Sequence, residues 1–324
     1  MRAVRSRTAG GPETLAVEEL PDPVPAAGEV LIDVAAAGLN RADSLQRRGR
    51  ANLPPGASDI FGMEVSGTVA EPGPGTGDFR RGEEVVALLD SGGYATRVAV
   101  PAAQVLPVPR GIGVIDAAGL PEAAATLVSN LCMAARFRAG ETVLIHGATG
   151  GIGTFGIQLV KALGGRAAVT ASSPAKLDAA AKLGADILIN YTAEDFAQVM
   201  AEAGGADIVL DTVAGPYLNR NLQALAPCGR IVTIGMQGGS QGHLNFAMLM
   251  KKKASVTGTL LRDRPAEQKA GIMAATRRLV WPLLESGDIT VTTDRVFPLS
   301  QVARAHEYFD SKDHVGKVLL DCRR

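Results

Sequence analysis

Three glycines within four positions, Gly150, Gly151 and Gly153, are the strongest chemical signal in the sequence. An apolar segment, 143–146, precedes them and a helix-forming segment follows, so they lie in a strand–turn–helix context. In such a turn the backbone can approach a pyrophosphate, and N–H groups at the helix start bind its oxygens. A plain tight turn does not explain this spacing. The segment predicts a dinucleotide-binding turn formed by Thr149, Gly150, Gly151, Ile152 and Gly153.

The residues after the second expected strand indicate which dinucleotide binds. Sites for NAD carry an acidic residue about 20 positions beyond the turn, which binds the ribose hydroxyls. Here the strand is followed by Ser172 and Ser173, which leave room for a 2′-phosphate, and Lys176 follows within reach. Tyr191, at the end of the next strand, could reach the same phosphate. The sequence predicts NADPH rather than NADH; alternatively, Lys176 is an ordinary surface lysine on a helix.

Short apolar segments alternate with helical segments from Glu141 onward, which is the pattern of parallel βαβ units. Strands are expected over 143–146, 166–170, 187–189, 208–210, 230–235 and 255–260, and helices over 153–163, 174–183, 195–203 and 217–225. The fold class is therefore α/β, with a doubly wound parallel Rossmann sheet. A further long helix is expected from after Pro265 to about Glu285.

The chain before this region consists of short strands divided by glycine and proline, which favours a β-rich, barrel-like domain. Strands are expected over 30–37, 64–70, 84–89 and 94–100, and a helical stretch over 116–135. The end of the chain returns to strand-like segments that finish at 317–320. We therefore expect a β-rich substrate domain of residues 1–118 and 290–324, interrupted by a Rossmann NADPH-binding domain of residues 119–289.

Composition excludes several classes of protein. The 33 Lys and Arg residues balance 33 Asp and Glu residues, so nothing predicts binding to nucleic acid. Three cysteines lie far apart, which argues against a disulfide framework and indicates a reducing compartment. No signal peptide and no apolar segment long enough to cross a membrane is present, so we expect a cytoplasmic protein.

Several segments together resemble the medium-chain dehydrogenase/reductase superfamily. They are the 36–43 segment AAGLNRAD, the 62–67 segment GMEVSG, the glycine turn and the 316–320 segment GKVLL, in an order that spans essentially the whole chain. Within the superfamily the chain resembles the zinc-free quinone oxidoreductase group, which includes zeta-crystallin, and NRADSLQRRG is close to its apoptosis-linked branch. The resemblance implies a GroES-like fold for the split domain and a homodimer joined through the Rossmann sheets.

The superfamily's alcohol dehydrogenases hold a catalytic zinc through two cysteines and a histidine. In this sequence Asn40 and Met63 occupy the first two positions, and Thr126 lies in the region of the third. Zinc needs several N, S or O ligands that converge, and the three cysteines and four histidines show no such grouping. No metal site is therefore expected.

The resemblance places two candidate catalytic residues, Asn40 and Thr126, near the nicotinamide. Asn40 could bind the carboxamide or a substrate carbonyl, or satisfy loop backbone groups, and Thr126 could begin a helix. Asp43 is expected to cap a helix or pair with an arginine, and Glu64 to pair with an arginine. Further cofactor contacts are expected at two strand ends and at a family position near the C-terminus: Gly235, Met236, Leu260, Leu261, Arg262 and Lys317. Core packing is the alternative for Met236 and Leu261.

The resemblance implies an NADPH-dependent reductase that passes a hydride directly to a small quinone. Such transfer depends on orientation and desolvation, with protons supplied by water or a hydroxyl. Two alternatives stay open: reduction of an α,β-unsaturated carbonyl (an enone), which a positioned acid would assist, and NADPH binding with little turnover. The family's tyrosine and tryptophan near the substrate are replaced by Ala51 and Ala124, which would open the pocket.

Overall fold

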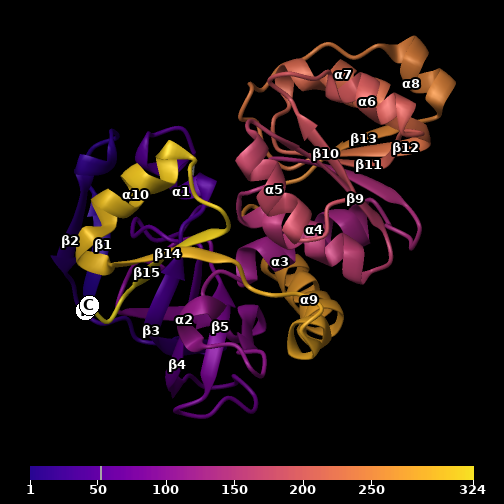
Figure 1. Ribbon diagram of the computed structural model, residues 1–324. Helices are drawn as coiled ribbons and strands as arrows, with labels where there is room; N and C mark the ends of the chain where they lie inside the picture. The colour runs from indigo at the N-terminus through magenta and orange to yellow at the C-terminus, as the bar shows by residue number, and fades with distance from the viewer. Residues whose placement is uncertain (52) are drawn as a thin grey trace. The chain divides into compact units, whose positions relative to one another are not determined.

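The computed structural model describes residues 1–51 and 53–324, which divide into two compact units (Figure 1). The first contains Met1–Ala125, Arg262–Ser286 and Val291–Arg324, and the second contains Thr126–Leu261 and Gly287–Thr290. The expected domain limits differ from this division mainly at 262–286, because helix α9 (Ala266–Ser286) packs against strand β7 (Val105–Pro107) of the first unit. Asn52, next to the position of the family tyrosine, lies outside the described residues.

The second unit is built on a six-stranded parallel sheet with the order β10-β9-β8-β11-β12-β13. Its strands are β8 (Thr142–His146), β9 (Arg166–Ala171), β10 (Ile187–Asn190), β11 (Ala206–Asp211), β12 (Leu225–Thr233) and β13 (Ser255–Gly258). In chain order this is the 3-2-1-4-5-6 arrangement of the Rossmann fold. The predicted α/β class and its parallel sheet are confirmed.

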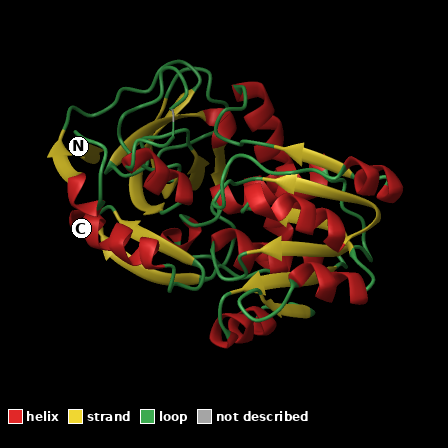
Figure 2. Ribbon diagram, turned by 90° about the horizontal axis from the view of Figure 1, so that it is seen from above, coloured by secondary structure: helices red, strands yellow, loops and turns green. Residues whose placement is uncertain are grey.

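Helices cover both faces of this sheet (Figures 1 and 2). They are α4 (Gly151–Ala162), α5 (Pro174–Lys182), α6 (Phe196–Glu202), α7 (Leu218–Ala224) and α8 (Phe246–Lys252), with a π-helical segment, η3 (Val128–Ala134), before β8. Because both faces are covered, the middles of the central strands are apolar, and Leu144, Val209 and Ile231 are completely buried. Helix α8 was not expected from the sequence.

The first unit contains a seven-stranded sheet of order β14-β15-β3-β4-β5-β7, in which β6 also pairs with β3. Its strands are β3 (Glu29–Gly38), β4 (Glu64–Pro72), β5 (Glu84–Leu88), β6 (Arg97–Pro101), β7, β14 (Thr293–Pro298) and β15 (Lys317–Asp321), with a separate hairpin of β1 (Arg2–Ser6) and β2 (Leu15–Glu19). Helices α1 (Arg41–Arg47), α2 (Val114–Ala117), α3 (Pro121–Leu127), α9 and α10 (Val302–Ser311) complete it.

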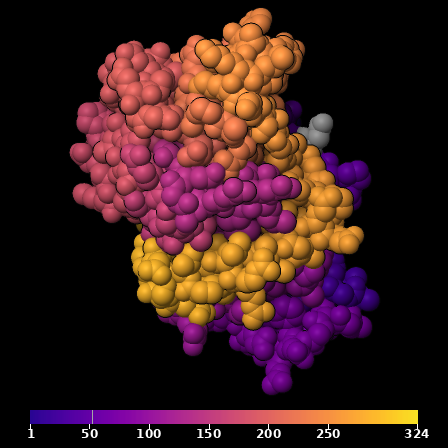
Figure 3. Space-filling view, turned by 90° about the vertical axis from the view of Figure 1, so that its right-hand side faces the viewer, coloured from indigo at the N-terminus to yellow at the C-terminus, as the bar shows by residue number. Residues whose placement is uncertain are grey.

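The C-terminal strand β15 lies antiparallel to β3, with Leu319 opposite Gly38. In the space-filling view the yellow C-terminal surface borders the purple N-terminal surface of the same unit (Figure 3). Val30, Val65 and Val318 meet in one hydrophobic core, so residues from both ends of the chain are needed to complete it. The predicted β-rich GroES-like domain with strands from both termini is confirmed. Among the described residues, no helix is both long and apolar enough to cross a membrane.

Candidate functional site

The glycine turn connects β8 to α4 in the second unit, as the sequence predicts. Gly147 has a positive φ of 86°, and its N–H donates to the Thr170 carbonyl, so the chain turns sharply at the strand end. The first bond inside the helix joins the Thr154 N–H to the Gly150 carbonyl at 2.9 Å. The N–H groups of the first helical residues, 151–153, therefore have no acceptor within the helix and can bind an anion.

Two glycines of this turn have different structural tasks. A Cβ at Gly153 would lie 2.1 Å from the Gly147 carbonyl oxygen, so only glycine lets α4 pack this closely on the turn. A Cβ at Gly150 would meet nothing within 4 Å, so this backbone surface is open for a bound group to approach. The arrangement fits a pyrophosphate. Within the turn, Thr149 is buried and Ile152 is half-buried.

The candidates for the adenosine end lie at the carboxyl ends of the neighbouring strands β9 and β10. Ser172 follows β9, and Ser173 is the N-cap residue of α5, where its side chain makes no capping hydrogen bond. Lys176 lies in the first turn of α5. Asn190 pairs with Ala171, so the following Tyr191, which is 42% exposed, lies at the same sheet edge. The structure therefore brings the predicted serines, lysine and tyrosine to the edge that carries the glycine turn.

The other strand-end candidates fall where the sheet order places them, but not all in one unit. Gly235 and Met236 follow β12, and Met236 is 60% exposed, which argues against core packing. Leu260 follows β13 and is 59% exposed, whereas Leu261 is half-buried. Arg262 is the first residue of the 262–286 segment that belongs to the first unit. Its Nε and Nη2 atoms are buried and have no hydrogen-bond partner among the described residues.

Thr126 is not a helix N-terminal residue: it lies in the last turn of α3 and is 6% exposed. Its carbonyl accepts a hydrogen bond from the Asn130 side chain at 2.7 Å, and Asn130 in turn accepts the Thr259 hydroxyl. Thr126 is thereby linked, within the second unit, to the segment that leads to Leu260. Asn40 belongs to the first unit.

Asn40 is held in the first unit by a buried cluster with Glu64 and Lys317. The Asn40 amide nitrogen donates to Glu64 Oε1 at 2.9 Å, and the Lys317 ammonium donates to Asn40 Oδ1 at 2.9 Å. Lys317 also donates to Glu64 Oε1 at 2.5 Å and to the Leu39 carbonyl at 3.1 Å. All three ammonium hydrogens thus have acceptors, and both ends of the Asn40 amide are fixed. We refer to these residues as the Asn40–Glu64–Lys317 cluster.

Two glycines, Gly38 and Gly119, leave space for the side chains of this cluster. A Cβ at Gly38 would lie 2.3 Å from Glu64 Oε1, and one at Gly119 would lie 2.8 Å from Lys317 Cγ. The second oxygen of Glu64 accepts the Glu122 N–H at the start of α3, at 2.9 Å. The expectation that Glu64 pairs with an arginine is therefore wrong, because the lysine of β15 reaches it instead. Likewise, Lys317 has a demonstrated contact with Asn40, and its predicted contact with a cofactor stays a prediction.

Asp43 supports the same loop. Its carboxylate accepts the Asn40 backbone N–H at 2.8 Å and the Tyr94 hydroxyl at 2.9 Å, so the predicted helix-capping role is confirmed. Complete burial raises the pKa of the Asp43 carboxyl from 3.8 to about 6, against the opposing effects of the Asn40 N–H and of Arg262. Burial and Asp43 raise the pKa of Tyr94 well above its usual value, which keeps the phenol a donor.

This pKa predicts a dependence of stability on pH. Between 3.8 and about 6 the folded protein binds a proton at Asp43 that the unfolded chain releases, so stability falls as pH rises through this window. Relative to Asp43→Asn, whose amide oxygen can still accept both hydrogen bonds, the wild type should lose roughly 2 kcal/mol from pH 4 to pH 7. Urea unfolding of both proteins across this range measures the difference. A difference that does not change with pH would contradict the assignment.

Comparison with known proteins tests the resemblance. Residues 26–110 match the family described as alcohol dehydrogenase GroES-like domain, and residues 151–276 match the family described as zinc-binding dehydrogenase. Quinone oxidoreductase of Rattus norvegicus is 30% identical over 99% of this chain and 97% of its own length. The chain belongs to the medium-chain dehydrogenase/reductase superfamily, in its quinone oxidoreductase-like group.

Two further members of this superfamily show how far the similarity extends. The 2-haloacrylate reductase of a Burkholderia species is 30% identical over 96% of both chains. The structure of Escherichia coli quinone oxidoreductase in complex with NADPH superposes with a TM-score of 0.87 at 28% identity, covering 99% of this chain and 100% of that one. The chain is therefore an oxidoreductase of this superfamily.

The zinc implied by one family description does not fit the residues found here. Of the superfamily's ligand positions, Asn40 is committed to Glu64 and Lys317, and Met63 is a buried thioether, 4% exposed. The Lys317 ammonium already provides a positive charge at Asn40, which would repel a second cation. Within residues 1–51 and 53–324, no three His, Cys, Asp or Glu side chains gather in a group that could hold a metal.

Proposed function

We propose that this protein is an NADPH-dependent quinone reductase of the zinc-free, zeta-crystallin-like kind, close to the apoptosis-linked branch. The observation that carries the proposal is the pair of serines with Lys176 beyond the glycine turn, where an acidic residue would favour NADH. Similarity over the full chain to quinone oxidoreductases, one of them in complex with NADPH, supports the same donor and acceptor.

The residues divide into those that would hold NADPH and those that would shape the site. Backbone N–H groups of 151–153 would bind the pyrophosphate, and Lys176 with its neighbouring serines would bind the 2′-phosphate. When bound, the nicotinamide supplies a hydride. Both N–H groups of the Asn40 amide already have acceptors, the Gly38 carbonyl and Glu64 Oε1, so Asn40 would orient the nicotinamide or the quinone through its amide oxygen, which accepts one bond from Lys317 and can accept a second. Glu64 and Lys317 would hold that amide in place. Such positioning suits a reaction that needs alignment more than acid–base groups.

Substituting Lys176 tests the cofactor assignment. Lys176→Glu is expected to lower kcat/KM for NADPH by at least about tenfold while leaving NADH use within about twofold, because a charge-assisted phosphate contact becomes a repulsion. Lys182→Glu, at the exposed far end of the same helix, is the matched control and should leave the NADPH/NADH ratio unchanged. An unaltered ratio in Lys176→Glu would remove the argument for NADPH over NADH.

A second candidate function is reduction of a carbon–carbon double bond conjugated to a carbonyl. The similarity to a 2-haloacrylate reductase favours it, and the hydride geometry would be the same. The proton would then have to reach carbon, for which a positioned acid helps. Absorbance of NADPH followed against ortho-quinones, para-quinones, enones and aldehydes separates the candidates. Quinone turnover supports the proposal, and turnover of enones alone supports the second candidate. Tight NADPH binding without turnover of any of them would indicate a binding protein.

We also propose that the protein forms a homodimer through the Rossmann sheet. Strand β13 is an edge of that sheet and all four of its residues are exposed. Large apolar side chains are exposed in the same unit: Met236 (60%), Phe246 (67%), Met250 (75%), Val256 (39%) and Leu260 (59%). An uncovered edge strand that carries the exposed apolar Val256, with Leu260 following it, is a surface that a second copy can cover.

The dimer proposal predicts that a charge on this edge separates the subunits. Val256→Lys, in β13, is expected to give monomers in light scattering coupled to gel filtration, because a lysine on the edge opposes strand pairing. Leu188→Lys, on the opposite edge strand β10, changes a residue of similar exposure (37%) and should leave the mass unchanged. A wild type that is monomeric at micromolar concentration, or a Val256→Lys protein that stays dimeric, would contradict the proposal.

A further inference from the structure

Asn130 is a polar side chain buried in η3 of the second unit. It is 1% exposed, and Val128 and Leu131 of the same segment are buried as well. An amide that leaves water costs free energy unless its groups find hydrogen-bond partners. The Asn130 amide nitrogen donates to the Thr126 carbonyl at 2.7 Å, and its Oδ1 accepts the Thr259 hydroxyl at 2.5 Å. The side chain therefore links the end of α3 to a residue 129 positions further along the chain.

The π-helical turn accounts for the first of these bonds. The segment η3 continues α3 without a break, and its backbone bonds span five residues, as in the bond from the Ala135 N–H to the Asn130 carbonyl at 2.9 Å. In an α-helix the partner of the Thr126 carbonyl would be the backbone N–H of Asn130. Here the side chain of the same residue donates to it. Single π-helical turns within helices are frequent at functional sites.

The second bond fixes the point where two strands of the Rossmann sheet end. Thr259 is the first residue beyond β13, and its N–H donates to the carbonyl of Thr233, the last residue of β12, at 3.0 Å. Strand β13 is an edge of the sheet, so it has a neighbouring strand on one side only. Leu260 and Leu261, which follow, have no polar side-chain group that could anchor the chain. Because edge segments with few bonds open easily, the bond to Asn130 is an important restraint on this point.

The order of the strands assigns this point to one half of a bound dinucleotide. The glycine turn follows β8, and ligands of such sheets lie at the carboxyl ends of the strands. The two serines and Lys176 follow β9, on one side of β8. With the adenosine end of NADPH held there, its nicotinamide end extends over the other side, beyond β11, β12 and β13. Thr259 lies at that end of the sheet.

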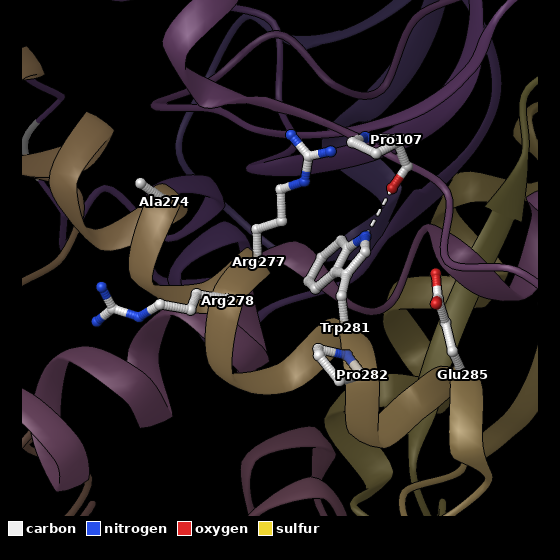
Figure 4. A pocket seen from close by; sticks show the side chains of 7 residues that line it. All are labelled: Pro107, Ala274, Arg277, Arg278, Trp281, Pro282 and Glu285. Atoms are coloured by element: carbon white, nitrogen blue, oxygen red, sulfur yellow. Dashed lines mark hydrogen bonds between the residues drawn. The ribbon is translucent and has the colours of Figure 1, made fainter.

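Trp281 is a useful comparison, because it too is a buried side chain that donates to a carbonyl. Its indole Nε1 donates to the Pro107 carbonyl at 2.8 Å, beside a hollow that is lined mainly by α9 (Figure 4). The charged groups of that hollow that extend from α9, such as Arg277 and Arg278, are exposed. The Trp281 bond joins α9 to β7 within the first unit and serves packing. The Asn130 bond differs because it ends at the carboxyl edge of the parallel sheet.

We propose that Asn130 is a positioning residue for hydride transfer, which holds the ends of β12 and β13 in place beneath the nicotinamide by binding Thr259. The inference rests on the proposed NADPH-dependent reduction. Asn130 is buried and both ends of its amide are engaged, so it acts through Thr259. Hydride transfer depends steeply on the distance and angle between the nicotinamide and its acceptor, so a small displacement of this surface slows it. The residues assigned to the pyrophosphate and the 2′-phosphate make no part of this contact.

Removal of the Thr259 hydroxyl tests the proposal with the least disturbance of the fold. Thr259→Val keeps the shape of a half-buried side chain and removes the donor to Asn130. We expect kcat, expressed per titrated NADPH site, to fall about tenfold or more, while the Kd for NADPH stays within about twofold. Thr259→Ser keeps the hydroxyl and should restore kcat. The matched control is Thr293→Val, which removes a half-buried hydroxyl bound to Asp116 at 2.7 Å in the first unit and should change neither value.

A double variant tests whether the two residues act as one unit. Asn130→Leu should lower kcat at least as much as Thr259→Val, and combining the two should lower it no further. Independent roles would instead multiply, to a loss of about a hundredfold. A multiplied loss, a wild-type kcat in Thr259→Val, or a failure of Thr259→Ser to restore kcat would overturn the proposal. A purely structural role would reduce the number of NADPH sites and leave kcat per site unchanged.

The emission of bound NADPH tests the role of Asn130 separately from turnover. A nicotinamide held in one enclosed position emits more strongly than the free cofactor. The emission of NADPH bound to Thr259→Val should therefore move toward that of free NADPH, whereas Thr259→Ser should match the wild type. If the wild type reduces neither quinones nor enones, the proposed function fails, and this measurement still decides the role of Asn130. Equal emission from the wild type and Thr259→Val would then contradict it.

Discussion

Replacing Lys317 with methionine is expected to lower the free energy of unfolding by roughly 3–5 kcal/mol, because Glu64 would keep a buried charge without its partner. Glu64 is completely buried, and its Oε1 depends on the Lys317 ammonium and the Asn40 amide. The variant should also let the Asn40 amide rotate, so reductase activity should fall with it. Guanidinium or urea unfolding measures the first effect, and kcat/KM with NADPH and a quinone measures the second.

The double variant Glu64→Gln with Lys317→Met tests whether the loss of stability comes from the unpaired charge of Glu64. Because it removes both charges together, it should recover most of the stability that Lys317→Met loses. The matched control is Lys161→Met, which breaks the partly exposed ion pair with Asp186 (2.7 Å) and should cost about 1 kcal/mol or less. If Lys317→Met costs no more than Lys161→Met, the Asn40–Glu64–Lys317 cluster is not the buried ion pair described above.

The second large effect is expected at the glycine turn, where alanine substitutions at two nearby glycines should have different consequences. One should lower stability and the other should weaken NADPH binding. Gly153→Ala places a Cβ 2.1 Å from a backbone oxygen that cannot move without reshaping the turn, so it should cost more than the roughly 1–3 kcal/mol typical of overpacking. Gly150→Ala meets no atom within 4 Å and has an ordinary φ of −73°, so stability should change little.

Gly150→Ala should instead weaken NADPH binding, because its methyl group would occupy the surface that the pyrophosphate approaches. We expect a loss of at least about tenfold in affinity, equivalent to about 1.4 kcal/mol, measured by titration of NADPH fluorescence. Thermal unfolding of the same samples supplies the control for stability. Undiminished NADPH affinity in Gly150→Ala would place the pyrophosphate elsewhere.

The sequence predicts those parts of the fold that repeat a local pattern. Apolar strands buried on both faces, glycine turns and helices between them give the strand order of the second unit once right-handed crossovers are assumed. Helix α8 was not predicted, because it is short and its apolar residues Phe246 and Met250 stay exposed instead of marking a buried face. The strand expected over 94–100 begins only at Arg97, because the backbone N–H groups of Tyr94 and Thr96 bond the Phe61 and Arg2 carbonyls instead of β3.

The contacts of the Asn40–Glu64–Lys317 cluster could not be predicted from local sequence patterns. Glu64 and Lys317 are 253 residues apart, and their contact depends on β15 joining β3 from the other end of the chain. A signal does exist: each is a charged residue that begins a strand and is followed directly by apolar residues, Val65 and residues 318–320, which indicates a buried partner of opposite charge. Sequence spacing alone does not say which two such residues meet.

Turnover of a quinone with NADPH, measured before and after treatment with a metal chelator, tests whether the protein is a zinc-independent NADPH reductase. We expect NADPH oxidation that depends on the quinone, a kcat/KM at least about tenfold higher than with NADH, and no loss of activity after chelation. A primary isotope effect with NADPH deuterated at C4 should accompany it, since the hydride moves directly. Activity that disappears on chelation and returns with zinc, or equal use of NADH, would show that the protein is not a zinc-free NADPH reductase.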